Sequence, residues 1–154
     1  MADVTPYWQN YIDGAWIDGG AGRIDVTDPA TGEWIAEQAL ADAADVDRAV
    51  EAARRAHPLG ALTALRPIER GRMVQAMGRY LLQHKDEIAR ILTLEQGKPL
   101  WESHIEVEGA ALYFEYYGNQ GSTVEGRSIP LGAGYMDWTE YEPFGVSAQI
   151  IPWN

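Results

Sequence analysis

The segment from Gly145 to Ile151 constrains the fold of this chain more than any other segment. It is short, apolar and rich in residues that favour strands, and such a run is typical of a strand buried on both faces of a parallel sheet. Parallel sheets occur almost only in α/β proteins, where helices cover both faces. The run therefore predicts an α/β fold in which this segment is an inner strand.

Short strands are also predicted near the start of the chain. The pair Asp13-Gly14 lies between two runs that contain aromatic residues, which is a strong signal for a tight β-hairpin. Pro29 and Gly32 favour a second tight turn over residues 28–32. The predicted strands are Gln9–Ile12, Ala15–Ile17, Arg23–Val26 and Glu33–Leu40.

Helices are predicted through the middle of the chain, where apolar residues recur at three- and four-residue steps. Asp42 is placed to cap the first helix, and Gly97 with Pro99 ends the third. Beyond the helices, Met136 and Trp138 alternate with polar residues and predict a half-exposed strand. The predicted helices span 43–56, a segment starting at Pro67, 85–96 and 100–119. We interpret their stripes as core rather than cofactor contacts: Val46, Ala49, Val50 and Ala53; Met73, Met77, Leu81 and Leu82; Ile105, Leu112, Tyr113 and Tyr116.

The composition excludes several classes of protein. The 154 residues amount to one ordinary domain, and 46% hydrophobic with 23% charged residues is typical of a globular protein. A net charge of −11 repels phosphate backbones and anionic lipid, so we expect neither nucleic acid nor membrane as a partner. No apolar stretch approaches the roughly 18 residues of a membrane helix, and the acidic start does not resemble a secretory signal. These features predict a cytoplasmic protein.

Residues needed for several kinds of chemistry are missing from the sequence. The chain has no cysteine, which excludes disulfides, thiolate metal sites and thiol nucleophiles. His57, His84 and His104 are too far apart to form a metal-binding pair on one helix face, so no metal site is predicted. The glycines of residues 19–22 do not open a helix in the manner of a dinucleotide fingerprint. No Walker lysine or nucleophile elbow is present.

Asn154 is the candidate catalytic residue. It follows the predicted inner strand and a rigid Pro152-Trp153 pair, and ligands of α/β sheets bind beyond the carboxyl ends of the strands. The amide of an asparagine can donate a hydrogen bond to an oxyanion that forms on a carbonyl substrate. A turn residue after a strand is the alternative interpretation, which one residue by itself leaves open.

Several motifs in the same order and spacing resemble those of the NAD(P)-dependent aldehyde dehydrogenase superfamily. The resemblance runs from about Tyr7 to Asn154 and departs from the family at residues 58–66, where a tryptophan is usual and this chain is rich in Gly and Ala. The matching motifs are Tyr141-Glu142-Pro143-Phe144-Gly145-Val146, Gln149-Ile150-Ile151-Pro152-Trp153-Asn154, Asp28 to Glu33, the helix Asp45 to Ala56, Leu94 to Pro99 and Glu125 to Pro130.

The resemblance implies a fold and a role for the matching positions. The fold is the N-terminal part of the family's Rossmann-like coenzyme-binding domain, with a leading β-hairpin, a helical layer and a β oligomerisation arm. The implied divisions are 1–125 for this domain, 126–142 for the arm and 143–154 for the first strand of the Rossmann-like sheet. The implied site residues are Asn154 for the oxyanion, Ile150, Ile151, Pro152 and Trp153 for the nicotinamide side of the cofactor cleft, and Gly109, Tyr113 and Tyr116 for the substrate tunnel.

The family's cysteine nucleophile and glutamate base belong to segments that follow the Pro-Trp-Asn motif. The resemblance therefore implies the N-terminal segment of an enzyme that oxidises a small-molecule aldehyde to a carboxylic acid with NAD or NADP. We expect the 154-residue chain to be inactive alone, to bind the cofactor weakly or not at all, and to form a homo-oligomer through residues 126–142. The alternatives are a non-catalytic, subunit-like protein that associates with full-length relatives, and an unrelated small α/β binding domain.

Overall fold

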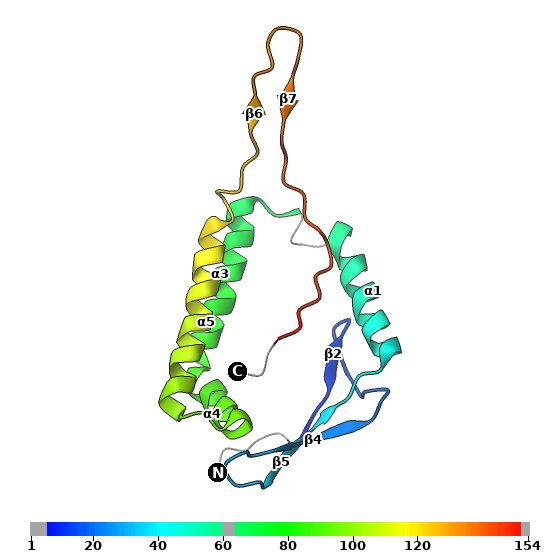
Figure 1. Ribbon diagram of the computed structural model, residues 1–154, viewed down its shortest axis with the longest axis vertical. Coiled ribbons are helices and arrows are strands. Elements are labelled where there is room, and N and C mark those ends of the chain that lie inside the picture. Colours follow the sequence, from blue (N-terminus) through cyan, green and yellow to red (C-terminus); the bar gives the residue numbers. More distant parts are fainter. Residues whose placement is uncertain (1–5, 60–63, 152–154) are drawn as a thin grey trace.

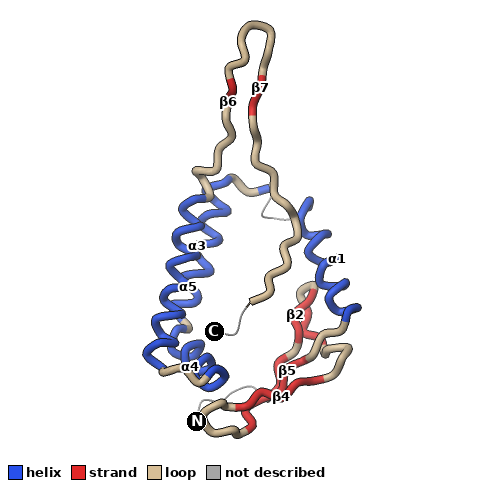
Figure 2. The backbone as a smooth tube through the Cα atoms, in the orientation of Figure 1, coloured by secondary structure: helices blue, strands red, loops and turns tan. Residues whose placement is uncertain are grey.

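A computed structural model of the protein describes residues 6–59 and 64–151. Its elements are β1 (Tyr7–Trp8), β2 (Asn10–Ile12), β3 (Ala15–Ile17), β4 (Arg23–Thr27), β5 (Trp34–Ala39), α1 (Ala43–Leu59), α3 (Pro67–Gln83), α4 (Lys85–Gln96), α5 (Leu100–Gln120), β6 (Ser128–Ile129) and β7 (Asp137–Trp138). Strands β4 and β5 lie at one end, with α1 on one side and the paired helices α3 and α5 on the other (Figure 1). A thin arm carries β6 and β7 at the opposite end. The C-terminal segment runs back from this arm between the two helical sides (Figure 2).

Both tight turns predicted near the start of the chain are confirmed. Strands β2 and β3 pair antiparallel across Asp13 and Gly14, whose φ angles of 54° and 80° suit a turn that matches the twist of a hairpin. Strands β4 and β5 also pair antiparallel, and between them the Asp28 carboxylate accepts a hydrogen bond from the Ala30 amide at 2.7 Å. Gly32 at this second turn has φ of 74°, a conformation that glycine adopts without steric cost.

A three-stranded sheet has the order β1-β5-β4, with β1 parallel to β5. Since side chains alternate between the faces of a strand, the pairings Trp8 with Gln38 and Val26 with Ala36 place these four residues on one face. The other face is polar: the Arg23 guanidinium lies 3.8 Å from the centre of the Tyr7 ring and pairs with the Glu37 carboxylate. The sheet therefore has one largely apolar face and one face held by charge and hydrogen bonding.

The predicted helix boundaries are confirmed to within a few residues. Helix α1 begins after Asp42, whose carboxylate accepts a hydrogen bond from the Asp45 amide at 2.9 Å, as expected of a capping residue. Helix α3 begins at Pro67, and α4 ends before Gly97, whose φ of 76° gives the left-handed cap that stops the helix. Local capping and turn chemistry therefore fixes where these helices begin and end.

Helices α3 and α5 pack antiparallel through small residues, and the predicted core of large apolar side chains is wrong for this chain. Gly71 and Gly78 of α3 are buried against Gly118 and Ala111 of α5. This close approach leaves the bulky side chains on faces that the described residues do not cover. Exposed positions among those predicted as core are Val46, Ala49, Ala53, Met73, Met77, Leu82, Ile105, Leu112, Tyr113 and Tyr116.

The strand predicted over residues 145–151 is not formed within the described part of the chain. Residues 143–151 adopt no regular secondary structure and are exposed, with Phe144 and Ile150 almost fully open to solvent. A strand buried on both faces needs a neighbouring strand on each side and helices above and below. The sheet formed by β1, β5 and β4 does not include this segment. The backbone of residues 145–151 therefore pairs with no strand of that sheet.

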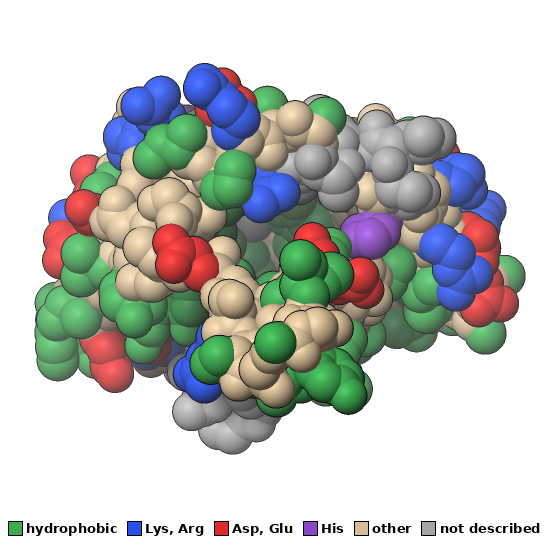
Figure 3. Space-filling model, turned by 90° about the horizontal axis from the view of Figure 1, so that it is seen from above, with side chains coloured by type: hydrophobic (Ala, Val, Ile, Leu, Met, Phe, Trp, Pro, Cys, Tyr) green, Lys and Arg blue, Asp and Glu red, His purple; other side chains and the backbone are tan. Residues whose placement is uncertain are grey.

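The arm is an antiparallel ribbon in which β6 pairs with β7, and the strand predicted around Trp138 is confirmed there. Two hydrogen bonds extend the ribbon: the Thr139 amide donates to the Arg127 carbonyl, and the Arg127 amide donates to the Thr139 hydroxyl, each at 2.9 Å. Seen from the arm end, the molecule exposes hydrophobic side chains among charged ones (Figure 3). Tyr135 and Met136 of the arm are exposed.

Candidate functional site

The residues proposed for the oxyanion and the cofactor cleft are only partly placed. Pro152, Trp153 and Asn154 lie outside the described residues. Ile150 and Ile151 are 99% and 79% exposed, so neither side chain is packed into the wall of a cleft. Both side chains are exposed because this segment pairs with no neighbouring strand, so no other element packs against them.

The three residues proposed for the substrate tunnel share one face of α5. Gly109, Tyr113 and Tyr116 are separated by four and three residues, which aligns them along a helix. A Cβ atom placed on Gly109 would meet no atom within 4 Å, and Tyr113 is 68% exposed. The structure therefore brings these residues together on an open face lined by aromatic rings, while Ile150 and Ile151 do not cover that face.

A buried carboxylate that sequence reasoning missed joins the first loop to α1. Asp45 is 1% exposed and accepts hydrogen bonds from the backbone amides of Gly20 at 2.7 Å and Asp42 at 3.1 Å, and Arg48 is its ion-pair partner. Hydrogen bonds to the charged carboxylate hold the pKa of Asp45 below its ordinary value. The bond from the Gly20 amide has the largest effect, and the bond from the Asp42 amide has the next largest. An acidic residue three positions after a capping Asp is the available sequence signal, because such a pair satisfies two free amides reciprocally.

Substituting Asp45 with asparagine is expected to lower the melting temperature by several degrees. It is also expected to make the melting temperature less dependent on pH at acidic pH. The depressed pKa means that the stability from this carboxylate is present above its unfolded pKa and is lost as the pH falls through its folded pKa. Thermal unfolding of both proteins between about pH 2 and pH 7 measures this loss, which begins below the ordinary Asp pKa of about 3.9. Asp47→Asn, an exposed neighbour on the same helix, is the matched control. Equal behaviour of the two variants would contradict the role of Asp45.

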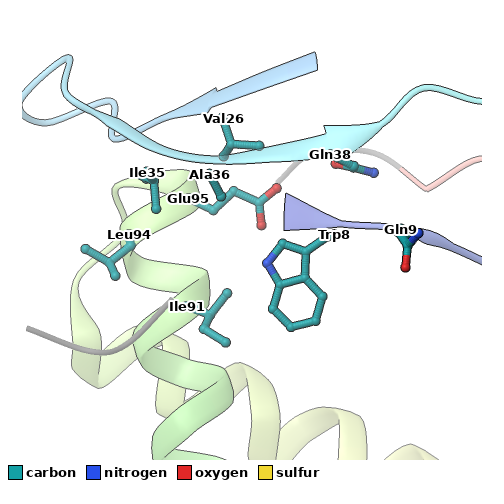
Figure 4. A pocket seen from close by; sticks show the side chains of 9 residues that line it. All are labelled: Trp8, Gln9, Val26, Ile35, Ala36, Gln38, Ile91, Leu94 and Glu95. Carbon is teal, nitrogen blue, oxygen red and sulfur yellow. The ribbon is translucent and has the colours of Figure 1, made fainter. Parts of the chain in front are cut away.

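A crevice of about 410 Å³ separates the apolar face of the sheet from α4. Trp8, Val26 and Ala36 contribute from the strands, and Ile91 and Leu94 contribute from the helix (Figure 4). The remaining lining residues are Gln9, Ile35, Gln38 and Glu95. The crevice combines an apolar interior with a small polar edge, which is the usual composition of a site for a small molecule.

No cluster of three or more His, Cys, Asp or Glu residues within 6–59 and 64–151 is arranged to hold a metal ion. Over the same ranges, no helix has the length and apolar character needed to cross a membrane.

The mixed α/β fold matches the N-terminal part of solved aldehyde dehydrogenase structures. The structure of PnpE in complex with nicotinamide adenine dinucleotide aligns with a TM-score of 0.80 and 39% identity, covering 85% of this chain and 27% of that chain. A NAD-dependent aldehyde dehydrogenase from Sinorhizobium meliloti aligns with a TM-score of 0.80 and 29% identity, covering 86% and 27%. The fold is therefore that of the coenzyme-binding part of these dehydrogenases.

The family model of the aldehyde dehydrogenases matches residues 16–154, and the chain belongs to this family. Among curated relatives, a glutarate-semialdehyde dehydrogenase from Pseudomonas aeruginosa is 38% identical over 151 residues, which cover 95% of this chain and 30% of the relative. The chain thus spans about 30% of the length of the relatives that it matches. The resemblance inferred from the sequence motifs is confirmed.

Proposed function

We propose that this chain contributes the N-terminal part of a catalytic unit that oxidises an aldehyde to a carboxylic acid with NAD or NADP. The observation that carries the proposal is the family match across residues 16–154 in a chain without cysteine. A thiol nucleophile must then come from polypeptide outside these 154 residues. The chain alone is expected to form no thiohemiacetal with an aldehyde.

We propose roles for individual residues from the same family match. The Asn154 amide donates to the oxyanion that forms when the aldehyde carbonyl is attacked, while Ile150, Ile151, Pro152 and Trp153 line the nicotinamide side of the cleft. Gly109, Tyr113 and Tyr116 form part of the wall along which the aldehyde enters, which their shared open face on α5 supports. The proposed divisions of the chain are 1–125 for the N-terminal part of the coenzyme-binding domain, 126–142 for the oligomerisation arm and 143–154 for the first strand of the Rossmann-like sheet in the whole enzyme.

We propose that this chain alone binds the dinucleotide weakly or not at all. The segment that carries Ile150 and Ile151 has no regular structure and both side chains are exposed. A pyrophosphate is usually held at a helix N-terminus that follows a strand of the nucleotide fold, and no strand is present there in the described residues. We therefore assign no step of the cofactor's chemistry to this chain.

We also propose that residues 126–142 mediate association between subunits. The arm extends away from the helices as a two-stranded ribbon (Figure 1). Its apolar side chains are open to solvent. Ribbons of this size have little independent stability in water, so a neighbouring subunit that covers the arm stabilises it. This proposal supports a homo-oligomer as the working assembly.

The test is aldehyde-dependent formation of reduced nicotinamide, followed by absorbance with aliphatic and aromatic aldehydes and with both cofactors. The 154-residue chain is expected to give no turnover above the rate without aldehyde. A protein that joins this chain to the segments following Asn154 in the family fold is expected to turn over, and to lose activity when its nucleophilic cysteine is replaced by serine. Turnover by the chain alone that survives removal of trace contaminants would overturn the proposal.

A further inference from the structure

Two Asp-Gly pairs lie close together near the start of the chain. Asp13-Gly14 forms the tip of the hairpin between β2 and β3, and Asp18-Gly19 directly follows β3. An aspartate that precedes glycine can cyclise, because glycine has no side chain to hinder the attack of its amide nitrogen on the carboxyl group. Both pairs have this local chemistry, so a difference in their reactivity must come from the fold.

The Asp13-Gly14 pair is open to solvent and weakly held. The Asp13 side chain is 68% exposed, and a Cβ atom placed on Gly14 would meet no atom within 4 Å. Within residues 6–59 and 64–151, Asp13 is the one residue other than glycine with a positive φ, 54°, which L-residues rarely adopt. Its carboxylate pairs with Arg55 of α1 at 2.9 Å, but an ion pair between two exposed side chains is weak. Neither the backbone nor the carboxylate of Asp13 is therefore held firmly against ring closure.

The carboxylate of Asp18 is held by two hydrogen bonds instead. Its Oδ1 atom accepts a hydrogen bond from the Tyr7 hydroxyl at 2.8 Å and another from the Gln9 side-chain amide at 2.9 Å. The bond from Gln9, followed by the bond from Tyr7, lowers the pKa of the Asp18 carboxyl. Ring closure uses the neutral acid, because hydroxide is expelled from it as water. These bonds therefore oppose the reaction at Asp18.

The backbone that follows Asp18 is also fixed in place. A Cβ atom on Gly19 would collide with the backbone of Leu40, so this glycine is closely packed. The next amide, that of Gly20, donates to the buried carboxylate of Asp45 at 2.7 Å. The Gly19 amide nitrogen cannot turn toward the Asp18 carboxyl unless this loop first opens.

We propose that Asp13 is a site of isoaspartate formation and that the fold protects Asp18 from the same reaction. The Gly14 amide nitrogen forms a bond to Cγ of Asp13, the bond from Cγ to its hydroxyl breaks, and one water molecule leaves. Water then adds to the resulting succinimide. Addition at the former backbone carbonyl breaks the bond between that carbonyl and the Gly14 nitrogen, and the chain then runs through the side-chain carbonyl of residue 13.

The product changes the hairpin and its contact with α1. The backbone at residue 13 becomes one atom longer, so the two-residue turn that pairs Ile12 with Ala15 no longer has its regular geometry. The free carboxylate is then attached directly to the Cα atom of residue 13, which shortens its reach toward Arg55. This modification site is separate from the proposed catalytic residues and does not depend on the proposed function.

The test is incubation of the folded 154-residue chain at physiological temperature and pH, followed by peptide mapping. Trypsin releases residues 1–23, which contain both pairs, and electron-transfer fragmentation shows which residue is isoaspartate. Isoaspartate is expected to accumulate about tenfold faster at residue 13 than at residue 18, because reaction at Asp18 first breaks two hydrogen bonds. In denaturant the two positions are expected to react at similar rates. A sample taken before incubation corrects for isoaspartate formed during digestion.

Two variants separate the effect of the fold from that of the sequence. Tyr7→Phe keeps the aromatic ring but removes one donor to Asp18, and it is expected to raise the rate at residue 18 about fivefold without changing the rate at residue 13. Asp13→Glu keeps the charge and is expected to abolish the product at residue 13, because a longer side chain does not close the five-membered ring. The proposal is overturned if both positions react equally in the folded chain, if Asp18 reacts faster, or if Asp13 stays intact while the denatured chain reacts.

Discussion

Gly71→Ala is expected to lower the free energy of unfolding by about 2 kcal/mol, within the usual range for overpacking a closed interior. A Cβ atom at this position would collide with the carbonyl oxygen of Gly118 on α5. A backbone atom held in a helix cannot move aside as a flexible side chain does, so the helices must separate and lose contacts on both sides. Chemical denaturation of the two proteins, with the slope checked for constancy, measures the loss.

Gly109→Ala is the matched control for this prediction. It places the same methyl group in the middle of a helix, but nothing lies within 4 Å of its Cβ position. Alanine is a better helix former than glycine by up to about 1 kcal/mol, so this variant is expected to be slightly stabilised. Similar effects of the two substitutions would show that the close contact between α3 and α5 does not hold the helical pair together.

Asn154→Ala is expected to lower kcat by about 10²–10³ in a protein that carries this chain together with the rest of the family fold. The magnitude is the usual loss when one donor to an oxyanion is removed. Because the interaction forms as charge develops on the carbonyl oxygen, the loss is expected in kcat, with little change in the affinity for the aldehyde. Steady-state kinetics with one good substrate measures both quantities.

The control for Asn154 is a second asparagine that is distant in sequence and has a structural partner. Asn119 accepts a hydrogen bond from Gln75 at 2.8 Å on the surface of the helical pair. Asn119→Ala is expected to leave kcat within about twofold, because exposed substitutions of this kind change stability by only about 0.5 kcal/mol. A loss of less than about threefold for Asn154→Ala would be far below the expected range and would remove Asn154 from the oxyanion site.

Local structure was predictable from the sequence because its causes are local. The Asp13-Gly14 turn, the cap at Asp42 and the left-handed Gly97 each depend on a few neighbouring residues, and the structure confirms all three. The Asp45 carboxylate was predictable in principle from its spacing to Asp42, but its bond to the Gly20 amide crosses 25 residues. Nothing in the local pattern indicates that this loop folds back onto the start of α1.

Packing was less predictable, because a stripe of apolar residues does not show which residues will cover it. The Met73 and Met77 stripe on α3 indicated a core face, yet α3 packs on α5 through Gly71 and Gly78. The apolar run that ends at Ile151 likewise indicated an inner strand, which cannot form without adjacent strands. The site residues came from motif resemblance, and the structure places only Ile150, Ile151 and the α5 face.

The open apolar faces of this chain are expected to be covered by other polypeptide, which sedimentation velocity at low micromolar concentration can measure. Association that increases with concentration is expected, since exposed apolar residues such as Phe144, Ile150 and Met136 favour contact between copies. Added salt is expected to increase association, because it screens the repulsion between chains of net charge −11. A monodisperse monomer at all concentrations, unfolding in one cooperative transition, would instead define these residues as a self-sufficient domain.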